Sequence, residues 1–518
     1  MSEKSDWYPR KLTRREFLAA AGSLPLAAAA AARGQTASLA GQSGNILIII
    51  CDQLSQRVLG CYGDKLSVTP NIDLLARSGV RFSNAYTNCP LCQPSRASFW
   101  TGRYPHETRI DSNFTTKTGP LIPSAMTTLG SIFQKAKYDT VHFGKQHDAG
   151  ALRGFSLIAS KEADLDSPKA WPVDYDSKED VNTTANVIRF LQESHDAPFL
   201  AVASLNNPHN ICGWVGENEG PHENIPLPEG SLLPPLPDNF EIKDLKNRPL
   251  PIQYLCCSHR RLRQAAQWNE LNYRHYLAAY YHYISLVDTQ VGQIMDALVS
   301  IPEAKNTLVV LMADHGDGMS SHRMVTKQVS FYEEMTRIPL IFSGAGLAGH
   351  SQLIREPMVS LLDLMPTLCD YAGLQAPADL PGRSLLPWIR DENPSGWPPY
   401  VVSEWQTEWG YTVSPGRMLR TSNFKYVRYL EGSGEELYDL ENDPGEKLNL
   451  AGLGQNRKDI EKLREMLKEH TRITRDPFFG LGVKVDPRWR SHKLGYANHE
   501  GPSAPEAAWE AEGRKENN

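Results

Sequence analysis

Residues 45–53 read Asn-Ile-Leu-Ile-Ile-Ile-Cys-Asp-Gln, an apolar run that ends in polar side chains able to do chemistry. Three later segments have the same plan: 139–144 leads into Lys145 and His147, 199–203 towards His209, and 307–312 into Asp314 and His315. Such runs, rich in β-branched residues and bounded by turn residues, are typical of strands buried on both faces of a parallel sheet. Ligands in such folds bind beyond the carboxyl ends of the strands. We therefore expect these polar side chains to lie at one edge of a sheet.

Helical and strand patterns in the rest of the chain indicate an α/β fold. Residues 70–78 are expected to form a short helix with proline in its first turn, and residues 275–298 a long amphipathic helix. After a break near residues 393–399, residues 400–405 and 418–429, interrupted at 422–423, have the pattern of strands. A charged helix follows at 458–470. We expect a mixed, mainly parallel central sheet flanked by helices, plus a small C-terminal antiparallel sheet with a helix.

The composition is that of an ordinary globular protein, with 41% hydrophobic and 22% charged residues and a mean hydropathy of −0.43. Its 518 residues suffice for a large core and for more than one domain. The net charge of −6 argues against a nucleic-acid partner, so an anionic ligand needs a local cluster of cations. Eight cysteines are too few for a disulfide scaffold in a chain of this length.

The N-terminal segment has the pattern of a twin-arginine (Tat) export signal. Residues 13–18 read Thr-Arg-Arg-Glu-Phe-Leu and precede an alanine-rich apolar run at 24–32. This run is shorter than the roughly 20 residues of a membrane span, and no later segment qualifies, so we expect no span in the mature form. The pattern predicts a bacterial protein that uses the Tat machinery and is periplasmic or exported. The alternative is a chance basic pair before an alanine-rich helix.

Residues 92–103 read Cys-Gln-Pro-Ser-Arg-Ala-Ser-Phe-Trp-Thr-Gly-Arg, the most specific stretch of the chain. The seven matching positions are Cys92, Pro94, Ser95, Arg96, Thr101, Gly102 and Arg103. Their spacing resembles the signature of the type I sulfatases of the alkaline phosphatase superfamily. The resemblance extends from Asn45 to about Ala451 and implies an alkaline phosphatase-like α/β fold. Cys89 and Cys92 also have the spacing of a redox dithiol, but a redox module would not need the residues that follow.

In that family the cysteine is oxidised to formylglycine, an aldehyde whose hydrate is the nucleophile. The resemblance therefore implies that a formylglycine-generating enzyme acts on Cys92. It also implies one divalent cation, usually calcium, with the ligands Asp52, Gln53, Asp314, His315 and the modified Cys92. Many members have a second aspartate where this chain has Gln53, and glutamine removes one negative charge. Magnesium and manganese stay open because His315 is a softer ligand than oxygen.

The resemblance assigns catalytic roles to Cys92, Arg96, Lys145, His147, His209 and Lys327. Arg96 follows the nucleophile by one helical turn and is expected near the formylglycine hydrate. Lys145 is expected to bind a sulfate oxygen, and His147 to contact the nucleophile or act as a base. His209 and Lys327 match residues that bind sulfate and protonate the leaving oxygen, a step that helps because an alkoxide is a poor leaving group.

Together these motifs predict a sulfuric ester hydrolase, a sulfatase that releases inorganic sulfate. Export and an aromatic-rich insert (Trp214, Tyr254, Trp268 and Tyr273) favour a sulfated carbohydrate, although these aromatic residues can equally cover the site. Gln53 leaves open a phosphonate monoester or phosphodiester hydrolase on the same scaffold, and a third hypothesis is an inactive scaffold that binds sulfated glycans. The expected divisions are a signal peptide at 1–40, a catalytic α/β domain at 43–395, a C-terminal α+β subdomain at 396–475 and a loose tail at 476–518.

Overall fold

A computed structural model describes most of the chain between residues 44 and 481. The described ranges are 44–113, 119–159, 177–218, 233–241, 248–249, 251–252, 265, 268–327, 330–345, 347, 351–406, 415–430 and 434–481. The predicted signal peptide, Tyr254 and most of the predicted tail lie outside these residues. In the described part, no helix is long and apolar enough to cross a membrane.

The centre of the fold is an eight-stranded sheet with the order β5-β4-β6-β1-β7-β8-β2-β9. Its strands are β1 (Asn45–Cys51), β2 (Gly79–Phe82), β4 (Asp139–Gly144), β5 (Ser156–Ile158), β6 (Phe199–Leu205), β7 (Thr307–Ala313), β8 (Leu340–Gly344) and β9 (Gln352–Ile354). Among these strands, β8 runs antiparallel to both its neighbours and the other pairings are parallel. The four segments predicted as buried strands form β4, β6, β1 and β7, which are consecutive in the sheet. Their carboxyl ends therefore share one edge.

Complete burial explains why these strands have continuous apolar runs instead of an alternating pattern. Every side chain from Ile46 to Ile50 is 0% exposed, and β1 pairs with β6 on one side and β7 on the other. Burying each Leu or Ile side chain contributes about 1.5–3 kcal/mol, so the five side chains of this strand make a substantial contribution to the core.

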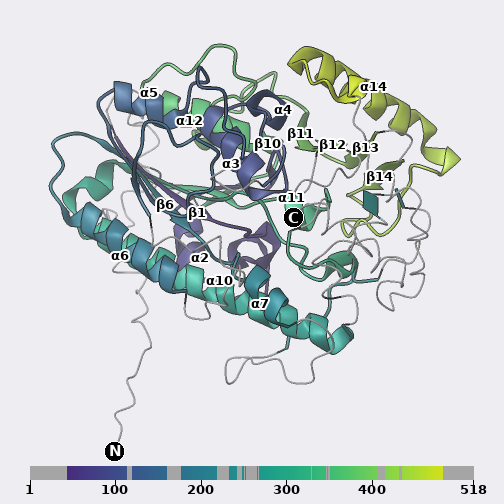
Figure 1. The fold of residues 1–518 in the computed structure, drawn as a ribbon, viewed down its shortest axis with the longest axis horizontal. Helices are drawn as coiled ribbons and strands as arrows, with labels where there is room; N and C mark the ends of the chain where they lie inside the picture. Colours follow the sequence, from purple (N-terminus) through teal and green to yellow (C-terminus); the bar gives the residue numbers. More distant parts are fainter. Residues whose placement is uncertain are drawn as a thin grey trace, which may run out of the picture.

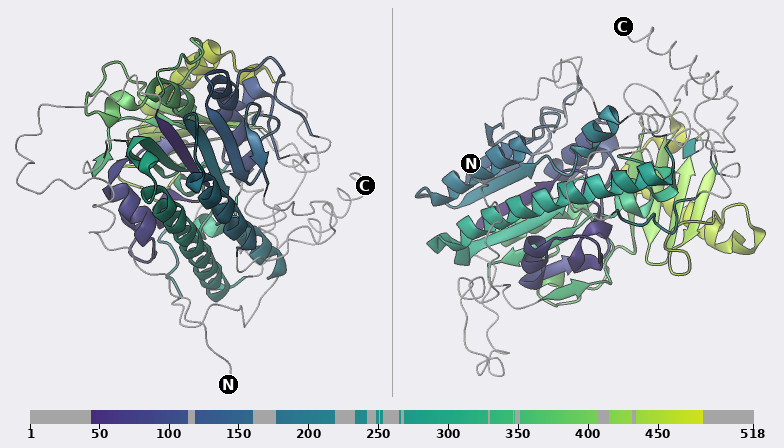
Figure 2. Two further views of the ribbon diagram at one scale, coloured as in Figure 1. Left: turned by 90° about the vertical axis from the view of Figure 1, so that its left-hand side faces the viewer. Right: turned by 90° about the horizontal axis from the view of Figure 1, so that it is seen from below.

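Helices cover both faces of the sheet (Figures 1 and 2). One face carries α2 (Pro70–Arg77), α6 (Lys178–Gln192) and α10 (Glu270–Val299), and the other α3 (Cys92–Thr101), α5 (Leu129–Lys135) and α12 (Leu364–Tyr371). α10 begins five residues earlier than its apolar pattern predicts. Asn269 caps it there, because the Asn269 side chain accepts from Asn272 N at 3.0 Å and the Asn272 side chain accepts in return. The shorter elements are α4 (Pro105–Thr108), α7 (Ile211–Glu217), α11 (Glu333–Thr336), α13 (Leu386–Ile389) and the pair β3 (Ala85–Tyr86) and β10 (Val359–Ser360).

A second, antiparallel sheet lies beside one end of the main sheet (Figure 2). It has the order β11 (Tyr400–Trp405), β12 (Gly416–Thr421), β13 (Phe424–Tyr429), β14 (Glu435–Asp439). The predicted interruption at 422–423 is the turn between β12 and β13. The predicted charged helix is α14 (Arg457–Thr474), whose Leu463 and Leu467 pack with Leu419 and Leu437 of this sheet. The α/β fold with a C-terminal antiparallel sheet is confirmed, whereas the domain boundaries at 395 and 475 stay predictions.

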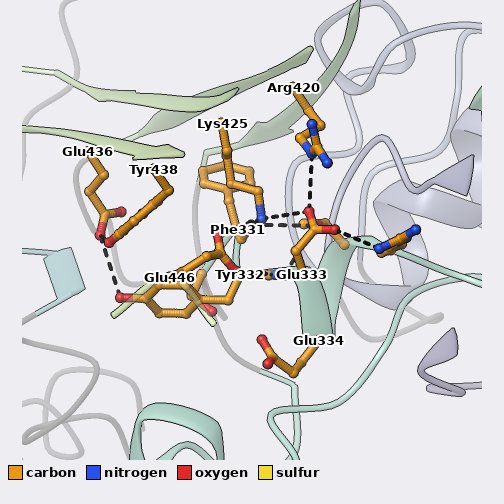
Figure 3. A network of polar contacts seen from close by, with 12 residues as sticks. Phe331, Tyr332, Glu333, Glu334, Arg420, Lys425, Glu436, Tyr438 and Glu446 are labelled. Carbon is orange, nitrogen blue, oxygen red and sulfur yellow. Dashed lines mark hydrogen bonds and ion pairs between the residues drawn. The ribbon is translucent and has the colours of Figure 1, made fainter. Parts of the chain in front are cut away.

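A buried ionic network joins the two sheets through α11 (Figure 3). Lys425 Nζ on β13 lies 3.0 Å from Glu333 Oε1 and 2.8 Å from Glu446 Oε1, and Arg420 Nε on β12 lies 3.4 Å from the same Glu333 oxygen. The backbone of α11 also accepts hydrogen bonds from the loop after β7, at 2.8 Å from Gly316 N to Met335 O. The C-terminal sheet is thus connected to the loop that follows β7.

Candidate active site

Two carboxylates meet where β1 and β7 end. Asp52 follows β1 and Asp314 follows β7, and because these strands are parallel neighbours their end loops lie side by side. Gln53 N donates to Asp314 Oδ1 at 3.1 Å, which ties one loop to the other. Gln53 has a φ of 69°, a left-handed conformation that turns the chain sharply after the strand. Asp52 and Asp314 are both 0% exposed.

Cys92 is the first residue of α3 and lies beside these carboxylates. Its Sγ is 3.1 Å from His315 Nε2, 3.1 Å from Lys327 Nζ and 3.8 Å from Asp52 Oδ1. His147 and His209 also hydrogen-bond to this thiol. The structure therefore brings together residues from five separate segments that the sequence predicted for one site.

Arg96 lies one turn further along α3 and bridges the two carboxylates. Its Nε is 2.8 Å from Asp314 Oδ2 and its Nη2 is 2.9 Å from Asp52 Oδ2. Nη1 donates to Ser204 Oγ at 3.0 Å, so all three sides of the guanidinium have partners. This arrangement neutralises part of the buried negative charge and fixes the distance between the carboxylates. A direct contact of Arg96 with the nucleophile's hydrate stays a prediction.

Lys145 and Lys327 place positive charge on two sides of Cys92. Lys145 Nζ forms an ion pair with Asp52 Oδ2 at 2.9 Å, and Lys327 contacts the thiol directly. Burial alone would raise the pKa of the Cys92 thiol, but Lys327, His315 and Lys145 outweigh it and hold the pKa well below its ordinary value. The site around residue 92 is therefore built to stabilise an anion.

The histidines of the site have opposite electrostatic surroundings. Burial and the charges of Lys145 and Lys327 lower the pKa of His209 to about 3, so this imidazole is neutral in the unliganded site. Burial also disfavours charge on His315, but Asp314 and Cys92 overcome it and raise its pKa to about 9. The charges nearest His209 are thus mainly cationic, whereas those nearest His315 are mainly anionic.

Four side chains could hold a metal ion. One donor atom each from Asp52, Cys92, Asp314 and His315 lies within 4.8 Å of the other three. Burial and the neighbouring charge of Asp52 raise the pKa of Asp314 to about 6, although Arg96 opposes this shift. The carboxylate oxygens of Asp52 and Asp314 are hard donors that fit a divalent cation such as Ca²⁺, whereas the sulfur of Cys92 is a softer donor.

Gln53, the fifth predicted ligand, has other partners in this structure. Its Nε2 donates to Asp317 Oδ2 at 2.7 Å, and its Oε1 accepts from the Cys212 thiol at 3.4 Å. Metal ligation by Gln53 stays a prediction.

Asp317 and two tyrosines of α10 are site neighbours that the sequence analysis did not identify. Tyr276 donates to Asp317, and the Tyr280 hydroxyl donates to Gln53 O at 2.6 Å. Helical spacing indicates only that such tyrosines are buried, not where their hydroxyls point. The one available signal for Asp317 was its place two residues after His315.

The described aromatic residues of the predicted insert are buried. Trp214, Trp268 and Tyr273 are each at most 3% exposed, and the Trp214 and Trp268 rings lie 5.9 Å apart. These three residues therefore pack under the surface and offer no open platform for a sugar ring.

The mixed sheet, with carboxylate, histidine and lysine side chains beyond its strand ends, has the architecture of the alkaline phosphatase-like class of proteins. Residues 44–374 match the sulfatase family, and residues 320–473 match the family described as N-sulphoglucosamine sulphohydrolase, C-terminal. The chain belongs to the sulfatase family, and it is a sulfuric ester hydrolase, as predicted.

Relatives and solved structures agree with this assignment. A Delta 4,5-hexuronate-2-O-sulfatase of Bacteroides thetaiotaomicron is 48% identical over 474 residues, which cover 91% of this chain and 97% of that protein. Human arylsulfatase K is 27% identical over 479 residues, 84% of each chain. The structure of a 2-O GAG sulfatase has a TM-score of 0.83 at 48% identity and covers 90% of this chain and 100% of that chain. The phosphonate monoester hydrolase of Agrobacterium radiobacter shares the fold alone, with a TM-score of 0.67 at 21% identity over 83% of this chain and 96% of that one.

Proposed function

We propose that this enzyme removes the 2-O-sulfate of a hexuronate in a sulfated glycan. The observation that carries the proposal is the 48% identity to a hexuronate 2-O-sulfatase over nearly the full length of both chains. The residues around Cys92 support a sulfatase, because Lys145 and Lys327 supply positive charge for one sulfate group beside it.

We further propose that Cys92 is oxidised to formylglycine, whose hydrate supplies a nucleophile that can release sulfate without a second attack at sulfur. A buried position at the start of α3, beside two lysines, suits an oxygen nucleophile that becomes anionic. Peptide mass spectrometry across residue 92, on protein from a host that matures sulfatases, tests this step. An unmodified thiol or a Cys89–Cys92 disulfide would contradict it.

The proposed cation site consists of Asp52, Asp314, His315 and residue 92, with Gln53 as a fifth ligand, and calcium is the proposed ion. When bound there, a divalent cation would supply positive charge that stabilises the sulfuryl oxygens. The protein's part is to hold both carboxylates at a fixed separation, which Arg96 and the strand ends do. Calcium titration of chelator-treated protein tests the site.

The remaining site residues have separate roles in binding and cleaving the sulfate ester. Lys145 and Lys327 bind sulfate oxygens, and His147 holds the nucleophile's proton. His209 donates a proton to the leaving alkoxide oxygen, which makes that oxygen a better leaving group. Burial is the largest cause of the low pKa of His209, and a sulfate anion at Lys145 and Lys327 would offset the charges that lower this pKa further, which favours the protonated imidazole that an acid role needs.

The decisive experiment compares sulfate positions within one substrate. We expect the matured enzyme to release sulfate from an unsaturated disaccharide that is sulfated at O2 of its hexuronate. The same disaccharide sulfated only at O6 of the hexosamine is the control and is expected to stay intact. Release from the control alone would contradict the 2-O assignment, and faster cleavage of an aryl phosphonate monoester than of any sulfate would favour the alternative that Gln53 left open.

We also propose that a bacterial twin-arginine pathway exports the enzyme to the periplasm or beyond. The sequence at residues 13–18 and the alanine-rich run after it support this proposal. Replacing both Arg14 and Arg15 by Lys is expected to leave the protein in the cytoplasmic fraction, and unchanged export would contradict it.

A further inference from the structure

The amide of Gln53 has a fixed direction in this structure. An amide side chain presents an oxygen at one side and an NH2 group at the other. The Gln53 NH2 donates to Asp317 Oδ2 at 2.7 Å, so the amide oxygen is directed away from Asp317. The described partner of that oxygen is the Cys212 thiol at 3.4 Å, a weak donor that leaves it able to bind a cation.

Asp317 accepts three hydrogen bonds and is 0% exposed. Tyr276 donates its hydroxyl to Oδ1, Met319 N donates to the same oxygen at 2.8 Å, and Gln53 donates to Oδ2. All three partners are donors, so the carboxylate acts purely as an acceptor. An acceptor at this position selects the NH2 side of the Gln53 amide and excludes the flipped orientation.

We propose that Asp317 is a positioning residue for the cation site and acts through Gln53. It holds the amide so that Gln53 presents its oxygen, and not its NH2 group, to a cation at Asp52 and Asp314. Its carboxylate also lies next to Gln53. It therefore supplies, at a longer distance from the cation, the negative charge that an aspartate in place of Gln53 would have provided directly. This inference rests on the proposed cation site.

Calcium affinity is the direct readout, because it does not depend on turnover. Full-length protein is stripped with a chelator and titrated with calcium chloride by isothermal calorimetry, and apo-protein thermal unfolding reports the fold. Asp317→Asn is expected to weaken calcium binding about 10-fold or more, within the range of other outer-shell ligand partners. Tyr276→Phe removes one of the three donors to Asp317 and is expected to weaken binding by a smaller factor.

A double-mutant cycle separates positioning from a general structural effect. In the Gln53→Ala background, Asp317→Asn is expected to cause little further loss of calcium affinity, because its route to the cation is already gone. Tyr283→Phe, two turns further along α10, is the matched control and is expected to keep wild-type affinity. If Asp317→Asn fails to fold, the cycle is run with Tyr276→Phe.

Two results overturn this inference while the proposed function stands: wild-type calcium affinity in Asp317→Asn, or an equal loss with and without Gln53. Absence of any calcium binding by wild-type protein instead overturns the proposed cation site, and this inference with it.

Discussion

At the scale of single residues, the site pairs its charges closely: Lys327 contacts Cys92, and Lys145 forms an ion pair with Asp52 beside it. Arg96 contacts both carboxylates and Lys145 pairs with Asp52, so part of the buried negative charge is neutralised before any cation binds. An anionic substrate and a cationic ligand can then occupy adjacent places without leaving either charge set unpaired.

The proposed acid role of His209 predicts a dependence on the leaving group. His209→Asn is expected to lower kcat/KM about 100-fold or more on a sugar sulfate, whose alkoxide needs a proton. On an aryl sulfate with an acidic phenol the loss is expected to be small, because that phenolate leaves without help. Parallel assays of sulfate release from the two substrates measure the contrast. Equal losses on both substrates would assign His209 to sulfate binding instead.

Sequence motifs predicted the residues of this site but not its second layer of contacts. Cys92 and Arg96 stand in a local signature, and Asp52 and Asp314 follow recognisable strands. Asp317 meets Gln53 across a sequence separation of 264 residues, and nothing in either local pattern encodes that contact. Such pairs are fixed by how strands and helices pack, which a single sequence does not show.

At the scale of elements, the loop after β7 is held against α11 with no space for an added side chain. A Cβ on Gly316 would lie 1.9 Å from the backbone oxygen of Glu334. Since that oxygen belongs to the main chain, it is the loop carrying Asp314, His315 and Asp317 that must move.

Gly316→Ala is therefore expected to lower calcium affinity and kcat/KM, and to destabilise the protein by about 1–3 kcal/mol through overpacking. Calcium titration and chemical unfolding measure the two effects. Gly216→Ala on α7 is the matched control, because a Cβ there meets nothing within 4 Å. Unchanged affinity in Gly316→Ala would mean that the loop position does not set the cation site.

The existence of the main elements could be predicted because their signals are local, but the start of α10 and the order of the sheet could not. Four apolar runs predicted β1, β4, β6 and β7. The early start of α10 depends on the Asn269 cap, which lies outside its apolar pattern. The antiparallel placement of β8 depends on pairing with β7 and β2, which are distant in sequence.

At the scale of the whole molecule, the C-terminal sheet contacts the first part of the chain through buried charges. His106 on α4 lies just after the nucleophile helix, and its Nδ1 is 2.8 Å from Glu404 Oε1 on β11. Burial disfavours the charged imidazole, but the hydrogen bond and charge of Glu404 overcome this effect and raise the pKa of His106 to about 9.

This contact predicts a loss of stability in alkali. Because the folded pKa lies above the ordinary value of 6.5, the contribution of His106 is complete below pH 6.5 and is lost as the pH rises through 9. The shift corresponds to about 3 kcal/mol at most. Chemical unfolding of wild type and His106→Gln at pH 6, 8 and 10 is expected to show a difference that shrinks with pH. A difference that stays constant would contradict a charged His106.

In the ionic network of Figure 3, a substitution of Lys425 is the strongest test of whether buried charges stabilise the contact between the two sheets. Lys425 is 0% exposed, contacts Glu333 and Glu446, and donates to Phe331 O at 2.6 Å. Lys425→Met leaves two buried carboxylates without this cation, and breaking a buried ion pair from one side costs about 3–5 kcal/mol. Arg420 still pairs with Glu333 in this variant. Most of the lost stability is therefore expected to come from Glu446, whose buried carboxylate no longer has Lys425 as a partner.

Removing the Glu446 carboxylate from the Lys425→Met variant should therefore restore part of the lost stability. Lys425→Met combined with Glu446→Gln is expected to be more stable in chemical unfolding than Lys425→Met alone, because the second change removes the carboxylate that has no cation. Lys468→Met on α14 is the matched control, since its pair with Glu465 is exposed and such pairs contribute about 0–1 kcal/mol. If Lys425→Met is no less stable than Lys468→Met, the network does not hold the C-terminal sheet to α11. The loop carrying the proposed cation ligands must then be held by the backbone hydrogen bonds of α11 and by its contacts with Gln53, Arg96 and Tyr276.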